Sequence, residues 1–274
     1  MQTLLRIEWL KIKNYRAFKI LSIFFAAGVI LANYAVHLFN KNVINNVNTG
    51  GLVSSFDPYS FYNTWKTTSY TSGFLLILPA MLLMILITNE YSFRTSRQNV
   101  IDGWSRNEFI SVKIVMAFII ALFSTVLVFL TAATMGLFSG TEFSANGISH
   151  LMYFFLKAAS YNMIALLIAV LIKKTGFAIG LYFIYLGFEN FVSQIFDILS
   201  MKLKMDGGPD IGGAGDYLPM NASDGLLTFP DNPLKAIAKS TMPTDYYWLV
   251  LTLAVLYLIV FVLWSRRKFI KSDL

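Results

Sequence analysis

The stretch TNEYSFRTSRQNVIDGWSRNEFISVK, residues 88–113, lies between two long apolar runs and carries charges of both signs. Loops that only connect packed helices are commonly about 2–8 residues long, whereas this polar stretch exceeds twenty residues. We therefore expect a structured, water-facing segment offered to a soluble partner. The alternative is a solvated loop whose charges only follow the topology. Its charged residues are Glu90, Arg94, Arg97, Asp102, Arg106, Glu108 and Lys113.

The rest of the chain has the composition of a membrane protein. It has 274 residues, of which 56% are hydrophobic and 14% are charged, whereas soluble domains carry about 25% charged residues. Several apolar runs approach the roughly 20 residues that a transmembrane helix needs, and no long period-two alternation indicates a membrane barrel. Because the chain has no cysteine, disulfides, thiolate metal sites and thiol catalysis are excluded.

The apolar runs predict an all-α polytopic protein with six transmembrane helices. Pro79 lies inside the second run and is expected to kink that helix, because proline lacks a backbone donor. Residues 40–69 and 199–244 are expected to form outer loops, and we interpret the glycine-rich stretch 207–215 as a flexible turn. The predicted spans cover about residues 20–39, 70–88, 114–138, 151–172, 177–198 and 246–264.

The distribution of Lys and Arg predicts the orientation of the chain. With the N-terminus inside, the inner segments hold 15 of the 22 Lys and Arg residues, which is the positive-inside pattern. Both termini are then cytoplasmic. Before the first span, Leu5, Trp9 and Ile12 share one helical face, so residues 2–15 are expected to form an amphipathic interfacial helix. The alternative is the n-region of a signal peptide, but no small-residue cleavage site follows.

Enzyme motifs are missing from the sequence. There is no GxxxxGK[ST], so the chain has no P-loop to cradle ATP phosphates. The two histidines, His37 and His150, are isolated near predicted membrane edges, which disfavours a metal or acid–base site. Glu90 and Arg94 form an ExxxR, as in some intramembrane proteases, but the paired glutamate is replaced by Asn89. We expect that this chain is not an enzyme and binds no metal.

The segment 89–113 fits the transmission of force from a soluble motor to the membrane. A short, rigid helix rich in Arg and Glu can seat in a cleft of the motor. Glu90 would tie it at its start and Lys113 at its exit. Gly103 permits a sharp turn beside Trp104, whose ring can anchor at the interface.

These residues resemble the membrane subunits of type-2 ABC exporters, the ABC-2 type permease family. The likeness in topology covers the whole chain, and the likeness in motif covers about 35 residues. A second matching stretch is YLPMNASDGLL, residues 217–227. A departure is that Asp102, Gly103 and Trp104 replace the proline common in this family. The motif consists of Glu90, Arg94 and Arg97, then Ser105 and Arg106, then Lys113.

The resemblance implies a transmembrane subunit of an ATP-binding cassette exporter. The abundance of Asn and Lys indicates a bacterial source, so the expected location is the inner (cytoplasmic) membrane. The resemblance also implies a homodimer or heterodimer bound to two copies of a separate ATPase, which would bind ATP and Mg²⁺. Residues 89–113 would be the coupling helix, and 199–244 would hold short re-entrant helices. The substrate would leave the cytoplasm or the inner leaflet. The alternative is a non-transporting scaffold or sensor that docks a soluble partner through 89–113. Without inverted repeats, a secondary transporter is disfavoured.

Two opposite charges lie inside the predicted membrane segments. Lys157 is about six residues from the outer end of the fourth span and Glu189 about nine from that of the fifth, which are depths of ~9 and ~14 Å at ~1.5 Å per residue. Opposite charges in adjacent spans offset one another's cost in lipid. We therefore predict a Lys157–Glu189 ion pair. Its role as a gating feature or as a structural pair stays open.

Overall fold

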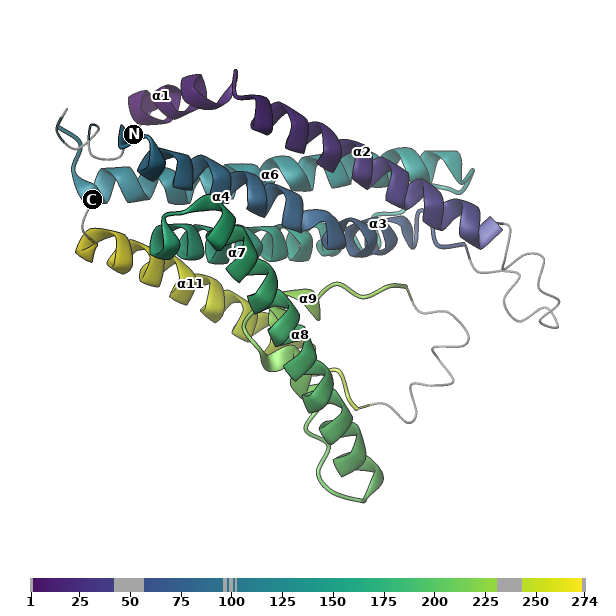
Figure 1. Ribbon diagram of the computed structural model, residues 1–274. Helices are drawn as coiled ribbons and strands as arrows, with labels where there is room; N and C mark the ends of the chain where they lie inside the picture. The colour runs from purple at the N-terminus through teal and green to yellow at the C-terminus, as the bar shows by residue number, and fades with distance from the viewer. Residues whose placement is uncertain are drawn as a thin grey trace.

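Six long apolar helices make up the body of the protein. The computed structural model describes residues 2–41, 57–95, 98, 101, 103–230 and 243–272. Successive spans alternate in direction, so that both termini lie at one end of the bundle (Figure 1). The spans are α2 (Arg16–Phe39), the continuous run Thr64–Ser92, α6 (Arg106–Phe138), α7 (Ser149–Ile172), α8 (Thr175–Met205) and α11 (Tyr247–Lys271).

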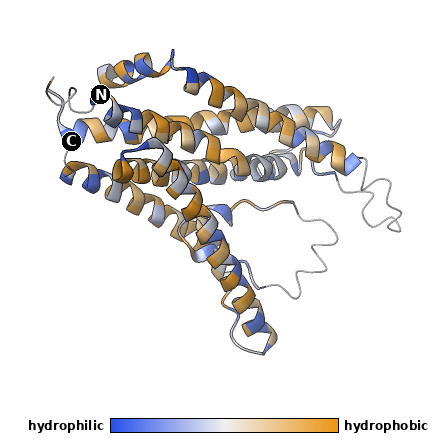
Figure 2. Cartoon of the chain, viewed as in Figure 1, coloured by the Kyte–Doolittle hydropathy of each residue, from blue (hydrophilic) through white to orange (hydrophobic). Residues whose placement is uncertain are grey.

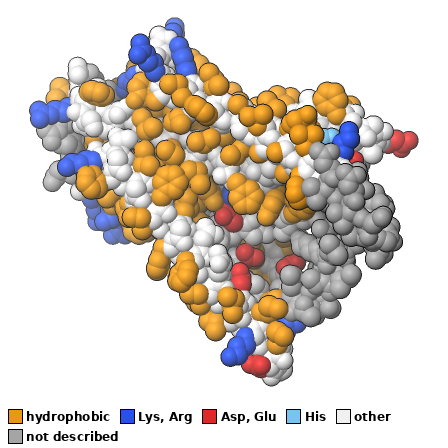
Figure 3. Space-filling view, turned by 45° about the vertical axis from the view of Figure 1, so that its right-hand side comes forward, with side chains coloured by type: hydrophobic (Ala, Val, Ile, Leu, Met, Phe, Trp, Pro, Cys, Tyr) orange, Lys and Arg blue, Asp and Glu red, His pale blue; other side chains and the backbone are white. Residues whose placement is uncertain are grey.

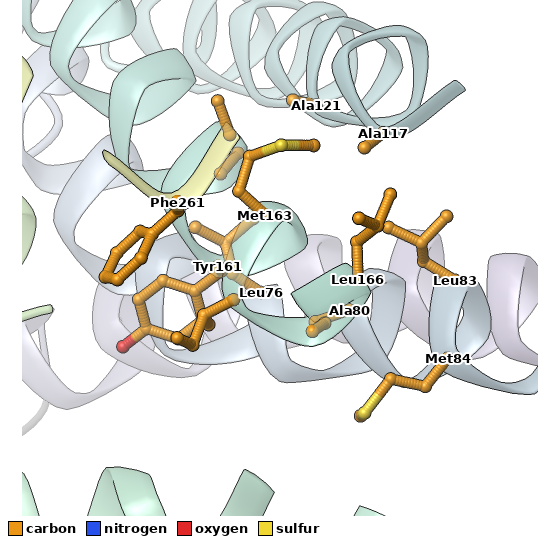
Figure 4. Packing of buried hydrophobic residues seen from close by; sticks show 14 of the residues in the cluster. Leu76, Ala80, Leu83, Met84, Ala117, Ala121, Tyr161, Met163, Leu166 and Phe261 are labelled. Atoms are coloured by element: carbon orange, nitrogen blue, oxygen red, sulfur yellow. The ribbon is translucent and has the colours of Figure 1, made fainter. Parts of the chain in front are cut away.

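The fourth span, α7, is the centre of the bundle. In its most apolar stretch 78% of the residues are buried, against 17–56% in the other spans. Met163 and Leu166 of α7 point between neighbouring helices, where Ala117 and Ala121 of α6 allow close approach (Figure 4). Small side chains at helix contacts are typical of membrane bundles, because they let backbones pack closely.

The outside of the bundle is apolar along its length. Large side chains such as Phe123, Ile184 and Leu256 are more than half exposed. Hydrophobic residues cover the length of the helices, while hydrophilic ones gather toward their ends (Figure 2). An apolar surface of this extent is typical of helices that lie in lipid or pack against another subunit within it. The chain is therefore a multi-pass membrane protein, as its composition predicted.

The second span begins earlier than predicted, at Thr64 rather than near residue 70. Its first part, α3 (Thr64–Gly73), is rich in Thr and Ser, yet most of it is buried. Two of the buried hydroxyls find backbone acceptors: Thr64 Oγ1 donates to the Ala132 carbonyl at 3.0 Å, and Thr67 Oγ1 to the Pro58 carbonyl at 2.6 Å. The third, fifth and sixth spans likewise extend beyond their predicted limits.

Pro79 lies just after an interruption of the regular helix in the second span. A 3₁₀ turn, η2 (Phe74–Leu76), separates α3 from α4 (Ile77–Ser92). Proline at position 79 cannot donate to the carbonyl four residues earlier, which lies in this turn. The tighter 3₁₀ pattern therefore marks the place where the regular helix is interrupted.

At the end opposite the termini, a segment folds back against α8. It contains the short helices η3 (Ala214–Tyr217) and α9 (Asn221–Asp224), and α8 itself leaves the bundle at an angle (Figure 1). The Gly215 N–H donates to Asp197 Oδ1 at 2.9 Å. A Cβ on Gly215 would lie 2.6 Å from Asp197 Oδ2, so only glycine permits this approach. The end of the glycine-rich stretch is thus docked against α8 at Gly215.

Asp216 makes the docking of this segment sensitive to pH. Burial, together with the carboxylates of Asp197, Asp245 and Asp224, raises the pKa of Asp216 to about 7. Between the ordinary value near 3.8 and this value, the folded state binds more protons than the unfolded one. Stability of the docked segment is therefore expected to fall as pH rises through this window, by up to about 1.4 kcal/mol per pH unit.

Hydrogen exchange of residues 207–227, corrected for intrinsic rates, measures this effect. The wild-type segment is expected to open more often at pH 8 than at pH 5, and Asp216→Asn is expected to lose this dependence. Asp206→Asn is the control, because Asp206 is exposed directly before this segment. Equal pH dependence in wild type and Asp216→Asn would show that another group titrates.

Candidate functional site: a buried ion network at the basic end

The end of the bundle that holds both termini is strongly basic. Figure 3 shows Lys and Arg side chains gathered there. Three connections converge at this end: the N-terminal helix α1 (Gln2–Ile12) with α2, the segment between α4 and α6, and the turn between α7 and α8. Exposed basic residues here include Lys13, Arg16, Lys19, Arg94, Arg106, Lys174, Arg266, Arg267, Lys268 and Lys271.

Four charged side chains from three helices meet beneath this surface. Lys113 of α6 lies 2.5 Å from Glu8 of α1 and 2.6 Å from Glu90 of α4. Lys11 of α1 contacts the same two carboxylates, at 3.0 and 3.4 Å. The four charges sum to zero. The side chains of Lys113, Glu8 and Glu90 are at most 10% exposed, and that of Lys11 is 34% exposed.

Oppositely charged neighbours hold Glu8 and Lys11 in their ionised forms. Burial acts to raise the pKa of Glu8, but Lys113 and Lys11 outweigh it, so that this pKa is lowered. Burial acts to lower the pKa of Lys11, but Glu90 and Glu8 outweigh it and raise this pKa. The stability from Glu8 is lost only as pH falls through its lowered pKa, and that from Lys11 only as pH rises through its raised pKa. Glu8 and Lys11 are therefore both charged near neutral pH.

The network fixes α1 to the transmembrane helices. Ile12 is 5% exposed and packs with Val112 and Met116 of α6. Trp9, which was predicted on the same apolar face, is 54% exposed and meets Phe18 edge-on at 6.1 Å. Leu5 is partly buried beside the Ile12 cluster. Two of the three predicted interfacial residues thus face the bundle, while Trp9 lies at its edge.

The segment between α4 and α6 is bounded by two defined turns. Helix α4 ends where Arg94 adopts a left-handed conformation, φ 57°, and its N–H bonds back to the Tyr91 carbonyl. Gly103, at φ 102°, supplies the second turn, as its freedom from a Cβ predicts. Ser105 then caps α6 in a capping box with Glu108. Arg97 lies outside the described residues.

Trp104 and Arg106 connect this segment to the rest of the basic end. The Trp104 ring packs on the core and lies 5.9 Å from Lys11 Nζ. Arg106 Nη1 donates to the carbonyls of Ile270 and Ser272, at 2.9 and 3.2 Å, which completes the last turn of α11. The same segment exposes two large apolar side chains, Phe93 at 74% and Ile101 at 83%.

The predicted pair of Lys157 and Glu189 is wrong as a direct contact. Lys157 Nζ lies 3.2 Å from Asp224 Oδ1 in α9. Glu189 Oε1 accepts the N–H of Met220 at 2.5 Å and that of Asn221 at 3.0 Å, at the start of α9. The two charges therefore hold opposite ends of one short helix. Both are buried, as the similar depths predicted, but a segment from outside the spans lies between them.

Sequence reasoning missed Glu8, Lys11 and Asp224. Glu8 is the only acidic residue in the basic stretch 2–15, and it follows Leu5 by three positions and precedes Ile12 by four, on the same face of the helix. Asp224 is the only charged residue of the segment 217–227. A charged residue that stands alone among residues of another kind usually has a partner. This signal could have identified Glu8 and Asp224.

The comparisons with known proteins agree with this architecture. A family model described as ABC-2 family transporter protein matches residues 4–189, which is more than half of the chain. None of the curated proteins matches the sequence. Within the described ranges, no group of three or more His, Asp or Glu residues could hold a metal ion. The chain belongs to the ABC-2 transporter family and is the transmembrane component of an ATP-binding cassette transporter, which implies association with an ABC ATPase.

Proposed function

We propose that this chain is the membrane subunit of an exporter, which moves a substrate out of the cytoplasm or the inner leaflet. Both termini and the basic end face the cytoplasm of a bacterial cell, in accord with the positive-inside pattern. The outward direction follows from the resemblance to type-2 exporters. Two permease chains, identical or related, bind two copies of a separate ATPase. That partner binds ATP and Mg²⁺, and the permease itself hydrolyses nothing.

The observation that carries the proposal is the segment between Glu90 and Lys113. Its two ends are joined by the 2.6 Å ion pair of these residues, while Phe93 and Ile101 project into solvent. A soluble partner can bind these exposed apolar side chains. Because the Glu90–Lys113 ion pair joins α4 to α6, a movement of the segment is transmitted to both helices. Through Glu8 the same movement reaches α1. The segment thus has the connections that a coupling element needs.

Co-purification with the ATPase from the native host tests this proposal. Burying a large apolar side chain contributes roughly 1.5–3 kcal/mol, so Phe93→Ser with Ile101→Ser is expected to weaken retention of the ATPase at least about tenfold. Phe138→Ser is the matched control, because Phe138 is 87% exposed at the opposite end of α6.

The alternative function is a non-transporting scaffold or sensor that docks a soluble partner through the same segment. A partner without any nucleotide site, lost in the double variant but kept in Phe138→Ser, would support the scaffold. A P-loop ATPase with the same pattern of loss supports the exporter. Full retention of the ATPase in the double variant would contradict coupling through Phe93 and Ile101.

A further inference from the structure

An apolar groove lies between α1 and the spans α2, α4 and α6. Its cavity volume is about 570 Å³, within the range of roughly 300–1,000 Å³ that holds small molecules. Along α6 its lining runs from Met116 to Leu127, which corresponds to about 16 Å at 1.5 Å per residue. Two lining residues, Ile119 and Phe123, are 37% and 68% exposed, so the groove opens on the outside of the bundle.

The charged residues that line this groove lie at one end. At that end lie Arg6 and Glu8 of α1, whereas the far end is formed by residues such as Phe25, Pro79 and Leu127. Glu8 forms ion pairs with Lys113 and Lys11. Arg6 forms no ion pair with any residue that the structure describes. The groove is therefore long and apolar, with one available cation at its mouth.

We propose that this groove binds an acyl chain of an anionic phospholipid, with the headgroup at Arg6. An acyl chain matches a narrow apolar channel that opens toward lipid, and a phosphate matches the guanidinium. The exposed Lys13, Arg16 and Lys19 continue the basic rim from α1 onto α2, so the mouth attracts anionic rather than neutral headgroups. The proposal depends on the membrane location of the helices and not on coupling to an ATPase.

A second copy of this chain fits the groove less well than lipid. Subunits of one membrane complex enter the bilayer in the same orientation, so a neighbouring copy would bring its own basic end to the same depth. The basic rim would then face another basic surface, and like charges repel. A lipid phosphate instead supplies the opposite charge.

Photo-cross-linking tests the occupant. The complete protein is placed in vesicles of phosphatidylglycerol and phosphatidylcholine, in which one or the other lipid carries a diazirine on its acyl chain. Labelled peptides are then mapped. The phosphatidylglycerol probe is expected to label residues 116–127 about fivefold more than the phosphatidylcholine probe, the ratio expected for one basic side chain at an anionic surface.

Two matched pairs of variants locate the site. Ser22 lines the groove, and its neighbour Ile23 is 67% exposed outside it, so Ser22→Trp is expected to remove the labelling and Ile23→Trp to keep it. Arg6→Glu is expected to reduce phosphatidylglycerol labelling about fivefold or more. Lys13→Glu changes the net charge equally without touching the groove and is expected to have a smaller effect.

Three results would overturn the proposal. They are equal labelling by the two probes, labelling that survives Ser22→Trp in folded protein, and no labelling of residues 116–127 by either probe. Because Arg6 is exposed, Arg6→Glu leaves the fold intact and keeps the test valid if Ser22→Trp does not fold. Labelling is measured without an ATPase, so a failure here is distinct from a failure of the coupling proposal.

Discussion

Replacing Lys113 by methionine is expected to destabilise the protein by about 3–5 kcal/mol, the cost of breaking a buried ion pair from one side. Methionine fills the space of the lysine stem but leaves Glu8 and Glu90 buried with only Lys11 between them. Two carboxylates then share one cation. The expected result is a clear fall in the Tm of the detergent-solubilised protein, together with release of α1 from the bundle. Protease sensitivity near residues 13–15 reports that release.

A second substitution distinguishes the loss of charge balance from the loss of packing. Lys113→Met combined with Glu8→Gln leaves one carboxylate, Glu90, for one cation, Lys11. This double variant is expected to recover at least half of the lost stability. Lys268→Met is the control, since Lys268 is exposed at the same end of the molecule. A double variant that is less stable than Lys113→Met alone would contradict the electrostatic account and assign the effect to packing.

The same network shows what sequence could predict at the basic end. Glu90 and Lys113 stand at the two ends of the charged stretch, and their role in tying it was predicted from that placement alone. Glu8 was missed because its contact depends on how α1 packs, and a contact across 105 residues of chain leaves only a weak local signal. Arg106 was predicted to serve coupling, and the structure also gives it a role in completing α11.

The spans were predictable for a different reason. In lipid each backbone polar group must be satisfied within its own helix, so a long apolar run leaves few alternatives. The reasoning failed at Thr64–Gly73, where Thr and Ser resemble a loop in composition. The acceptor of the buried Thr64 hydroxyl is the Ala132 carbonyl in α6, which lies 68 residues away in the chain. Local composition cannot reveal such an acceptor.

Replacing Lys157 by methionine is expected to cost about 3–5 kcal/mol, for the same reason as at Lys113 but inside the membrane. Lys157 is 6% exposed, and its ammonium lies 3.2 Å from Asp224 and 5.4 Å from the Tyr161 ring centroid. Without it, Asp224 and Glu189 hold α9 with two negative charges and no cation. The fall in Tm is the first measurement. Lys202→Met, at an exposed site on α8, is the control.

The partner of Lys157 decides which second substitution restores stability. If the ion pair is with Asp224, Lys157→Met with Asp224→Asn recovers most of the loss, because Tyr161 can still donate to the amide oxygen as it does to the carboxylate at 3.0 Å. Lys157→Met with Glu189→Gln is expected to recover less, since Glu189 already accepts two backbone N–H groups. Greater recovery in the double variant with Glu189→Gln would instead support an ion pair between Lys157 and Glu189. The stable double variant then tests whether these charges serve gating or structure. If it stimulates the partner ATPase as the wild type does, the charges are structural. If it is stable but no longer stimulates the ATPase, the charges serve gating.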